Sequence, residues 1–162
     1  MSWKKRLMKS LTDQMEKKVK IKMFKPKFIG LLSCSGEDFP GGSISRVATR
    51  KVLTEFLPGM TTAICVPLFL NGNEQETKFV KNFPCITIDG CEKACVKKSL
   101  EAMGKKPVES INLSEFFSKD EYKQIMSGPI HDLDWNDNPL TLKLAEHIAI
   151  LSAKHLKEMN MI

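Results

Sequence analysis

The feature that most constrains the fold of this chain is a series of short strand-like runs alternating with stretches of helical spacing. Apolar runs that we expect to form strands cover residues 28–33, 61–68 and 85–88, and a fourth strand is expected over 107–113. Helices are expected over 43–57, 74–82, 91–103, 118–126 and 139–158. Strands that are apolar throughout are typical of a parallel sheet covered on both faces. The sequence therefore predicts a three-layer α/β domain with a mostly parallel sheet of about four strands.

The expected order of these strands is that of a doubly wound sheet, Rossmann-like or flavodoxin-like, with right-handed crossovers. No repeat or low-complexity linker divides residues 26–162, so we expect a single α/β metal-binding domain there, with helical extensions at both ends of the chain. In such sheets the site forms at the carboxyl ends of the strands. Residues that follow the strands are therefore the candidates for function.

The first 25 residues differ in charge from the rest of the chain. Residues 1–27 hold ten lysines and arginines against two acidic residues, whereas the remainder holds fifteen against seventeen. Trp3, Leu7, Leu11 and Met15 recur every four residues, which indicates a basic amphipathic helix that ends before Pro26. A solvated helix is the common case, and docking on a protein partner is the alternative. With few aromatic residues in the arm, specific nucleic-acid binding is not expected.

The five cysteines point to metal or thiol chemistry. The chain shows no secretory signal and no apolar stretch of membrane-spanning length, so we expect it to be cytoplasmic and not transmembrane. Disulfides are rare in that reducing compartment. Metal binding or reactive thiols are the better explanation for cysteines in such a chain.

Four of the cysteines are expected to meet at one edge of the sheet. Cys34 ends the first predicted strand, Cys65 falls late in the second, and Cys91 follows the third. Cys95 lies one helical turn beyond Cys91 on the predicted helix. Four thiolates suit a tetrahedral zinc ion. Cys85 starts the third strand, a strand's length from that edge, and is expected to be a core residue.

A glycine-rich segment after the first strand, "SCSGEDFPGGSIS" over 33–45, nearly matches a phosphate-binding loop. Its glycines fit G-x-x-x-x-G-K-[ST], but Gly42 stands where the lysine must be, and Glu37 and Asp38 would repel phosphate. A nucleotide site is therefore not expected. The glycines would instead bring backbone N–H groups near an anion, at the start of a helix capped by Ser43. That anion is either the thiolate cluster or a small anionic substrate.

The stretch "IDGCEKAC", residues 88–95, resembles the DGC-domain family, whose members are described as zinc-binding proteins. The family is named for the triplet found here as Asp89-Gly90-Cys91. The likeness covers about residues 28–115 and includes Cys34-Ser35-Gly36. It implies that the metal ligands are Cys34, Cys65, Cys91 and Cys95, and it implies no established reaction. Cys85 matches no family position.

Residues beside the expected ligands have supporting roles in this interpretation. We expect Asp89, Gly36 and Gly90 to surround the ligands without binding the ion, and Asp89 is equally well explained as a turn residue. His147 and His155 are expected to be surface or packing residues. His131 lies in an acidic loop that is either solvated or a lid over the site.

Several functions remain open from the sequence. The first is a zinc-binding protein that takes a small anionic or thiol ligand. The alternatives are a thiol-redox enzyme that uses Cys91 and Cys95, an iron–sulfur cluster protein, and an adaptor that docks through its basic arm. Whether the chain is an enzyme is not decided by its sequence.

Overall fold

The computed structural model describes residues 28–159, so the expected basic arm lies outside the described residues. The first half of the fold consists of β1 (Ile29–Ser33), α2 (Pro40–Lys51), the π-helical turn η1 (Val52–Phe56), β2 (Thr61–Ala63), α3 (Val66–Leu70) and α4 (Glu74–Asn82). The second half consists of β3 (Cys85–Asp89), α5 (Cys95–Ala102), β4 (Glu109–Asn112), α6 (Leu113–Phe116), α7 (Lys119–Met126), the 3₁₀ turn η2 (Asp132–Trp135) and α8 (Pro139–Glu158). Among these residues, no helix is both long and apolar enough to cross a bilayer.

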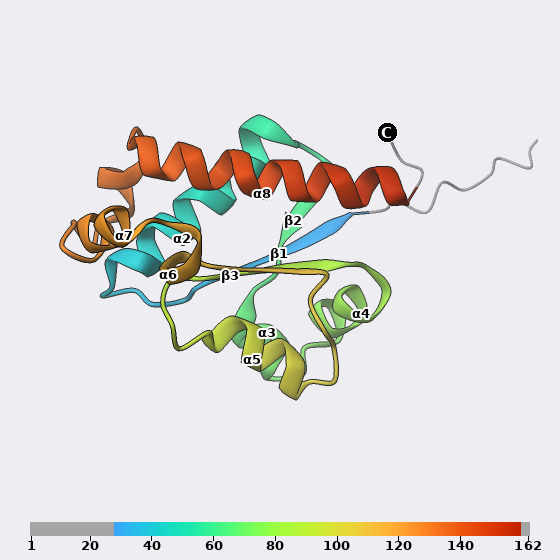
Figure 1. Ribbon diagram of the computed structural model, residues 1–162. Coiled ribbons are helices and arrows are strands. Elements are labelled where there is room, and N and C mark those ends of the chain that lie inside the picture. Colours follow the sequence, from blue (N-terminus) through green and yellow to red (C-terminus); the bar gives the residue numbers. More distant parts are fainter. Residues whose placement is uncertain (1–27, 160–162) are drawn as a thin grey trace, which may run out of the picture.

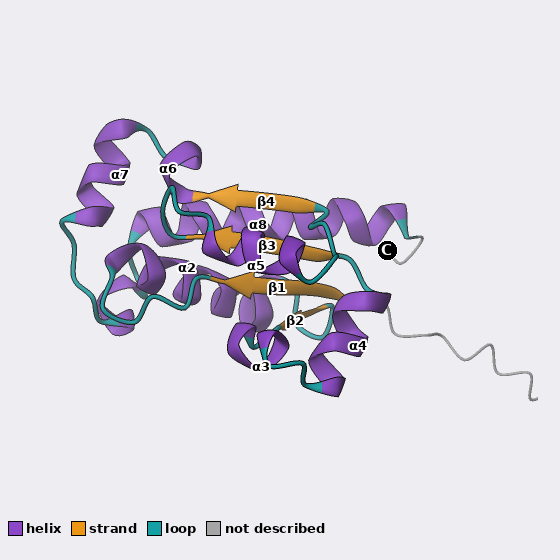
Figure 2. Ribbon diagram, turned by 90° about the horizontal axis from the view of Figure 1, so that it is seen from below, coloured by secondary structure: helices purple, strands orange, loops and turns teal. Residues whose placement is uncertain are grey.

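The sheet has four parallel strands in the order β2-β1-β3-β4 (Figure 2). The chain passes from β1 to β2 on one side and then returns past β1 to form β3 on the other side. The strand order therefore reverses between β1 and β3, which pair in register from Gly30 with Cys85 to Ser33 with Ile88. This order confirms the predicted α/β fold, and it places a switch point at the carboxyl ends of β1 and β3.

Helices cover both faces of the sheet and complete the three predicted layers. In Figure 1, α2 and α8 lie on one face, and α3, α4 and α5 lie on the other. Each face has its own apolar core: Ile44 and Ile148 belong to the first, and Phe69 and Leu100 to the second. The reversal explains this division, because right-handed crossovers in opposite directions place their helices on opposite faces.

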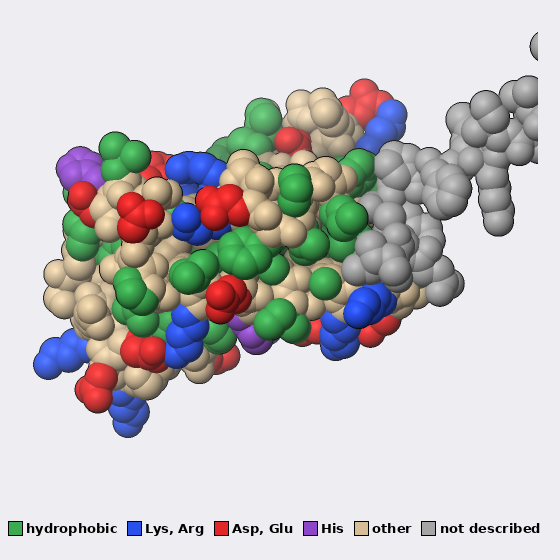
Figure 3. All heavy atoms as spheres, turned by 90° about the horizontal axis from the view of Figure 1, so that it is seen from above, with side chains coloured by type: hydrophobic (Ala, Val, Ile, Leu, Met, Phe, Trp, Pro, Cys, Tyr) green, Lys and Arg blue, Asp and Glu red, His purple; other side chains and the backbone are tan. Residues whose placement is uncertain are grey.

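The C-terminal helix α8 is part of the main core. It begins at Pro139, where the Asn138 side chain accepts a hydrogen bond from the Leu140 N–H, and it packs along α2. Leu144, Ile148 and Leu156 are completely buried. Figure 3 shows the outer side of this layer, where hydrophobic side chains are scattered among charged ones. The predicted helical extension is therefore present, and it is needed to cover the sheet.

The second predicted strand is much shorter than expected. The apolar run 61–68 forms only the three-residue strand β2, and the chain then turns into α3 at Val66. Pro67 accounts for the difference, because proline lacks the N–H of a strand ladder and suits the first turn of a helix. Cys65 therefore lies at the N-cap of α3 and not within a strand.

Two predicted helix starts were also wrong. The first helix begins at Pro40 after the N-cap Phe39, so Ser43 is not its cap; its hydroxyl donates to the Ile130 carbonyl inside the fold. The third predicted helix, expected over 91–103, is α5 in the structure, and it begins at Cys95 and not at Cys91. Cys91 and Cys95 consequently do not share a helix face, since a turn separates them.

Candidate functional site

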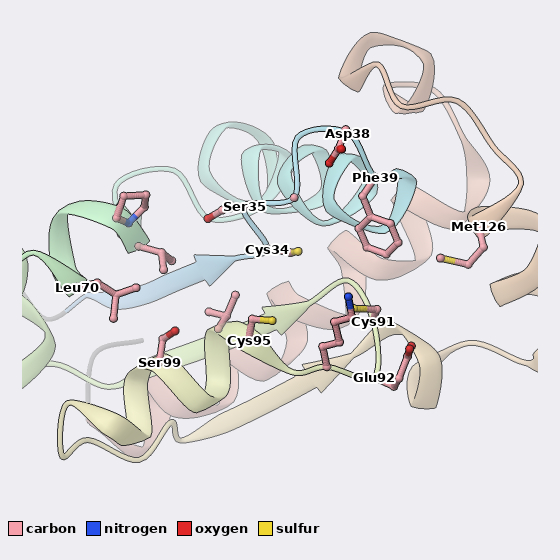
Figure 4. A pocket seen from close by; sticks show the side chains of 15 residues that line it. Cys34, Ser35, Asp38, Phe39, Leu70, Cys91, Glu92, Cys95, Ser99 and Met126 are labelled. Atoms are coloured by element: carbon pink, nitrogen blue, oxygen red, sulfur yellow. The ribbon is translucent and has the colours of Figure 1, made fainter.

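A pocket of about 770 Å³ opens at the switch point, between the loops that follow β1 and β3 (Figure 4). This volume is within the usual range for small-molecule sites. The pocket is lined by Cys34, Ser35, Gly36, Asp38, Phe39, Val66, Pro67, Leu70, Cys91, Glu92, Lys93, Cys95, Val96, Ser99 and Met126. Three cysteines thus come to one cavity from two strand ends and the start of a helix. They are free and half-buried or exposed.

Cys34 is held at the tip of β1 by the sheet itself. Its backbone N–H donates to the Ile88 carbonyl at 2.9 Å, which continues the ladder one residue beyond the strand. The following loop is fixed by Arg46 of α2, whose guanidinium donates to the Gly36 carbonyl at 2.7 Å. Arg46 was not identified from the sequence, since nothing local shows that it reaches back ten residues. Its effect is to hold the Cys34-Ser35-Gly36 turn against α2.

The glycines of the segment 33–45 and of the DGC triplet allow two backbones to touch. A Cβ atom on Gly90 would lie 2.6 Å from the carbonyl carbon of Gly41, closer than side-chain carbons approach backbone. A Cβ on Gly42 would collide with the carbonyl of Gly36. The first turn of α2 is therefore in contact with the loop after β3 at Gly90, and with the loop after β1 at Gly36. This close approach explains the glycines without any phosphate.

Asp89 of the triplet fixes where α5 begins. Its buried carboxylate accepts hydrogen bonds from the backbone N–H groups of Val96, at 2.7 Å, and Lys97, at 3.1 Å. These are among the N–H groups that a helix cannot satisfy internally. Burial raises the pKa of Asp89 above its ordinary value, and the two N–H bonds oppose that rise. Asp89 thus holds the backbone amides at the start of α5, beside the thiols.

The turn that carries Cys91 is tied down from two sides. The Asn112 side chain, at the end of β4, donates to the Cys91 carbonyl at 2.9 Å. On the other side, the Tyr122 hydroxyl of α7 donates to the Glu92 carboxylate at 3.3 Å. Burial and the neighbouring Glu92 and Cys91 raise the pKa of Tyr122 to about 12. Asn112 and Tyr122 lie 21 and 30 residues from their partners, so sequence spacing gave no indication of them.

The turn ends in a left-handed residue just before the last thiol. Ala94 has φ of 50°, the one positive value among the non-glycine residues described. A left-handed conformation costs a residue with a Cβ roughly 1–2 kcal/mol. This conformation reverses the chain so that Cys95 becomes the first residue of α5 and lines the pocket.

The two remaining cysteines lie apart from the pocket lining. Cys65 is exposed at the N-cap of α3, directly before the lining residues Val66 and Pro67. Cys85 is completely buried at the other end of β3, where burial raises the pKa of its thiol to about 11. Cys85 is therefore a core residue, in line with its predicted place.

The cysteine thiols suit zinc in kind and number, but the described structure does not bring them into coordination. Among residues 28–159, no three histidine, cysteine, aspartate or glutamate side chains lie close enough together to hold a metal ion. Binding through Cys34, Cys91 and Cys95 would require the loops around the pocket to close. Cys34, Cys65 and Cys91 lie outside the helices and strands, whereas Cys95 is the first residue of α5.

The acidic loop that contains His131 is tied to the fold through one of its acids. Asp132 accepts from Arg46 at 2.8 Å and pairs with Arg50. Burial alone would raise the pKa of Asp132, but the hydrogen bond and charge of Arg46 lower it below its ordinary value. The same guanidinium thus holds both this loop and the Cys34 loop. His131 is exposed and does not line the pocket.

Fold and pocket together define a doubly wound α/β protein with thiols at its switch point. The family model described as DGC domain matches residues 30–132, which is more than half of the chain. The chain belongs to the DGC domain family. The match extends beyond residue 115 and includes α7, which supplies Met126 and Tyr122 to the site. No curated protein and no solved structure matched the chain.

Proposed function

We propose that this protein binds one zinc ion through the thiolates of Cys34, Cys65, Cys91 and Cys95. The observation that carries the proposal is that three of these thiols line one pocket at the switch point, where doubly wound proteins bind their ligands. The buried Asp89 and Gly90 support the proposal, because they fix the turn between β3 and α5 that carries Cys91. A zinc ion held by all four thiolates would be structural, and release of one thiolate would free a position for a ligand.

In this proposal the thiols reach the ion from three places in the fold. The sheet and Arg46 hold Cys34, so it is the fixed thiol. Small shifts of Cys91 and Cys95 across the same pocket, and of Cys65 at the start of α3, would complete the ligand set. The thiols lose their protons to solvent as they bind, so zinc retention should weaken in acid. A reducing compartment such as the cytoplasm would keep them available.

The test is the zinc content of single serine variants, purified without oxygen. Replacing Cys34, Cys91 or Cys95 by serine should lower zinc retention and reduce the free energy of unfolding, because metal binding contributes to folding. Cys85→Ser is the matched control, because this thiol is remote from the pocket; it should keep its zinc. Cys65→Ser should likewise lower zinc retention, and full zinc content in this variant would contradict the assignment of Cys65 as a ligand.

Two other outcomes would replace the proposal. Full zinc content in the double variant Cys91→Ser, Cys95→Ser would end it, and a thiol-redox function for these two residues would then lead. A brown protein with visible absorption and iron in place of zinc would instead identify an iron–sulfur cluster.

A further inference from the structure

The walls of the pocket are more apolar than thiol or metal chemistry requires. Beside the cysteines, the lining includes Phe39, Val66, Pro67, Leu70, Val96 and Met126. In Figure 4, Leu70 and Met126 lie at opposite ends of the pocket, with the three sulfur atoms between them. The thiols are therefore flanked by apolar surface on both sides.

Part of this apolar surface is exposed to water. Leu70 is 46 % exposed and Met126 is 38 % exposed, although both line a concave site. Single exposed apolar residues are common and need no explanation. Exposed apolar residues on both sides of one pocket leave apolar surface in contact with water, and such surface is typical of ligand sites.

The charges at the pocket disfavour an anionic occupant. The charged lining residues are Asp38, Glu92 and Lys93, so acids outnumber bases. An anion would therefore meet repulsion here, whereas an uncharged molecule would not.

We propose that this pocket binds a small uncharged organic molecule with an apolar body, which contacts Leu70 of α3 and Met126 of α7 beside the thiols. A pocket of about 770 Å³ holds a molecule of one or two fused rings with substituents. This ligand site shares the pocket with the proposed zinc site but rests on the apolar walls and not on the metal. Of the two ligand classes that the sequence left open, small anions are disfavoured.

The test uses two dyes with the same apolar body. N-phenyl-1-naphthylamine is uncharged, and 1-anilinonaphthalene-8-sulfonate carries one negative charge; both fluoresce more strongly in apolar surroundings. We expect saturable binding of the uncharged dye at one site per chain, and weaker binding of the sulfonate. The full chain is titrated both as purified and after removal of metal with a chelator. Tighter binding of the sulfonate, or no saturation with the uncharged dye, would overturn the proposal.

Two leucines of α3 provide a matched pair for locating the dye. Leu68 and Leu70 are both 46 % exposed and lie two residues apart, but only Leu70 lines the pocket. Leu70→Gln should raise the Kd of the uncharged dye by about tenfold, as expected from losing the burial of one leucine side chain. Leu68→Gln should leave the Kd unchanged. Equal effects of the two substitutions would place the dye outside the pocket and overturn the proposal.

A second pair of variants, outside α3, tests the same proposal if a variant in α3 fails to fold. Met126→Gln alters the opposite wall, and Met103→Gln changes a methionine of similar exposure, 44 %, outside this pocket. Only Met126→Gln should weaken dye binding. Dye binding without zinc retention would contradict the zinc function alone, and zinc retention without dye binding would contradict the ligand site alone.

Discussion

Gly90, the middle residue of the family triplet, lies where the loop after β3 contacts the backbone of the first turn of α2. Its neighbour across the contact is Gly41, and neither position has room for a Cβ atom. Beside it, the Asp89 carboxylate holds the first N–H groups of α5. Two residues of the triplet therefore act by fixing the backbone that presents the third, Cys91.

Adding one methyl group at this contact should destabilise the protein. In Gly90→Ala the new Cβ would meet backbone atoms of Gly41, which cannot rotate away, so we expect a loss of about 1–3 kcal/mol in the free energy of unfolding. Gly36→Ala is the control, because its nearest neighbour is the Phe39 ring at 3.2 Å, a side chain that can shift. Urea unfolding compares them. Equal losses of stability in the two variants would show that the contact between Gly90 and Gly41 does not cause the destabilisation of Gly90→Ala.

The buried carboxyl of Asp89 should make stability depend on pH. Burial raises its pKa above the ordinary 3.8, so the folded state favours the protonated form. The contribution of Asp89 is therefore fully present below pH 3.8 and is lost as the pH rises through the higher pKa of the folded state. Relative to Asp89→Asn, the wild-type chain should lose stability over that window and then stay level. Urea unfolding from pH 3.5 to 7 measures the difference; a rise instead would mean that the N–H bonds outweigh burial.

At the scale of elements, the turn between β3 and α5 is the most specialised part of the fold. Asn112 fixes its start, the left-handed Ala94 forms its end, and Tyr122 of α7 reaches its middle through Glu92. Two elements distant in sequence, β4 and α7, thus help to determine where the thiols of this turn lie. Helices α4 and α7, by contrast, begin at local side-chain caps, Asn73 and Ser118.

Replacing Ala94 by glycine should stabilise the chain. Glycine adopts positive φ without strain, so the substitution relieves backbone strain in the folded state. This relief exceeds the entropic cost of the more flexible unfolded chain, so we expect an increase of about 0.5–1 kcal/mol in the free energy of unfolding. Lys98→Gly, in the interior of the adjoining helix α5, should have the opposite effect and lower the free energy of unfolding by about 0.5–1 kcal/mol. Thermal and urea unfolding of both variants check this. Destabilisation by Ala94→Gly would show that the Ala94 methyl group contributes packing that outweighs its strain.

At the scale of the whole molecule, the fold depends on a helix that comes last in the chain. α8 covers the same face as α2, and its buried residues belong to the larger core. Its far end is held to β4 by His155, whose ring nitrogen lies 3.0 Å from the Glu109 carboxylate. The sheet edge and the last helix are thus joined both by apolar packing and by a charged contact.

Shortening one buried side chain of α8 should show that this helix belongs to the core. Ile148 is completely buried, and Ile148→Ala should cost about 2–5 kcal/mol through the cavity it leaves. Ile150, on the same helix, is 66 % exposed, and Ile150→Ala should change stability by about 0.5 kcal/mol or less. Urea unfolding measures both. A small effect of Ile148→Ala would mean that α8 docks loosely.

The sequence by itself determined the fold class and the elements that carry their own start signals. Helices α4 and α8 span the expected residues, because Asn73 and Asn138 supply caps and apolar spacing supplies the buried face. The placement of Cys34 and Cys91 at the switch point also followed from the sequence, since the carboxyl ends of parallel strands must share an edge.

Only the tertiary structure decided how the thiols are presented. The start of α5 depends on a carboxylate from the preceding strand, and the turn before it depends on Asn112 and Tyr122. The position of Cys65, by contrast, follows from a local signal, because Pro67 ends the strand early. The apolar walls of the pocket include residues of α3 and Met126 of α7, which come to opposite ends of one cavity only in the folded chain. Contacts between residues far apart in sequence leave no local pattern, so no spacing rule could have revealed them.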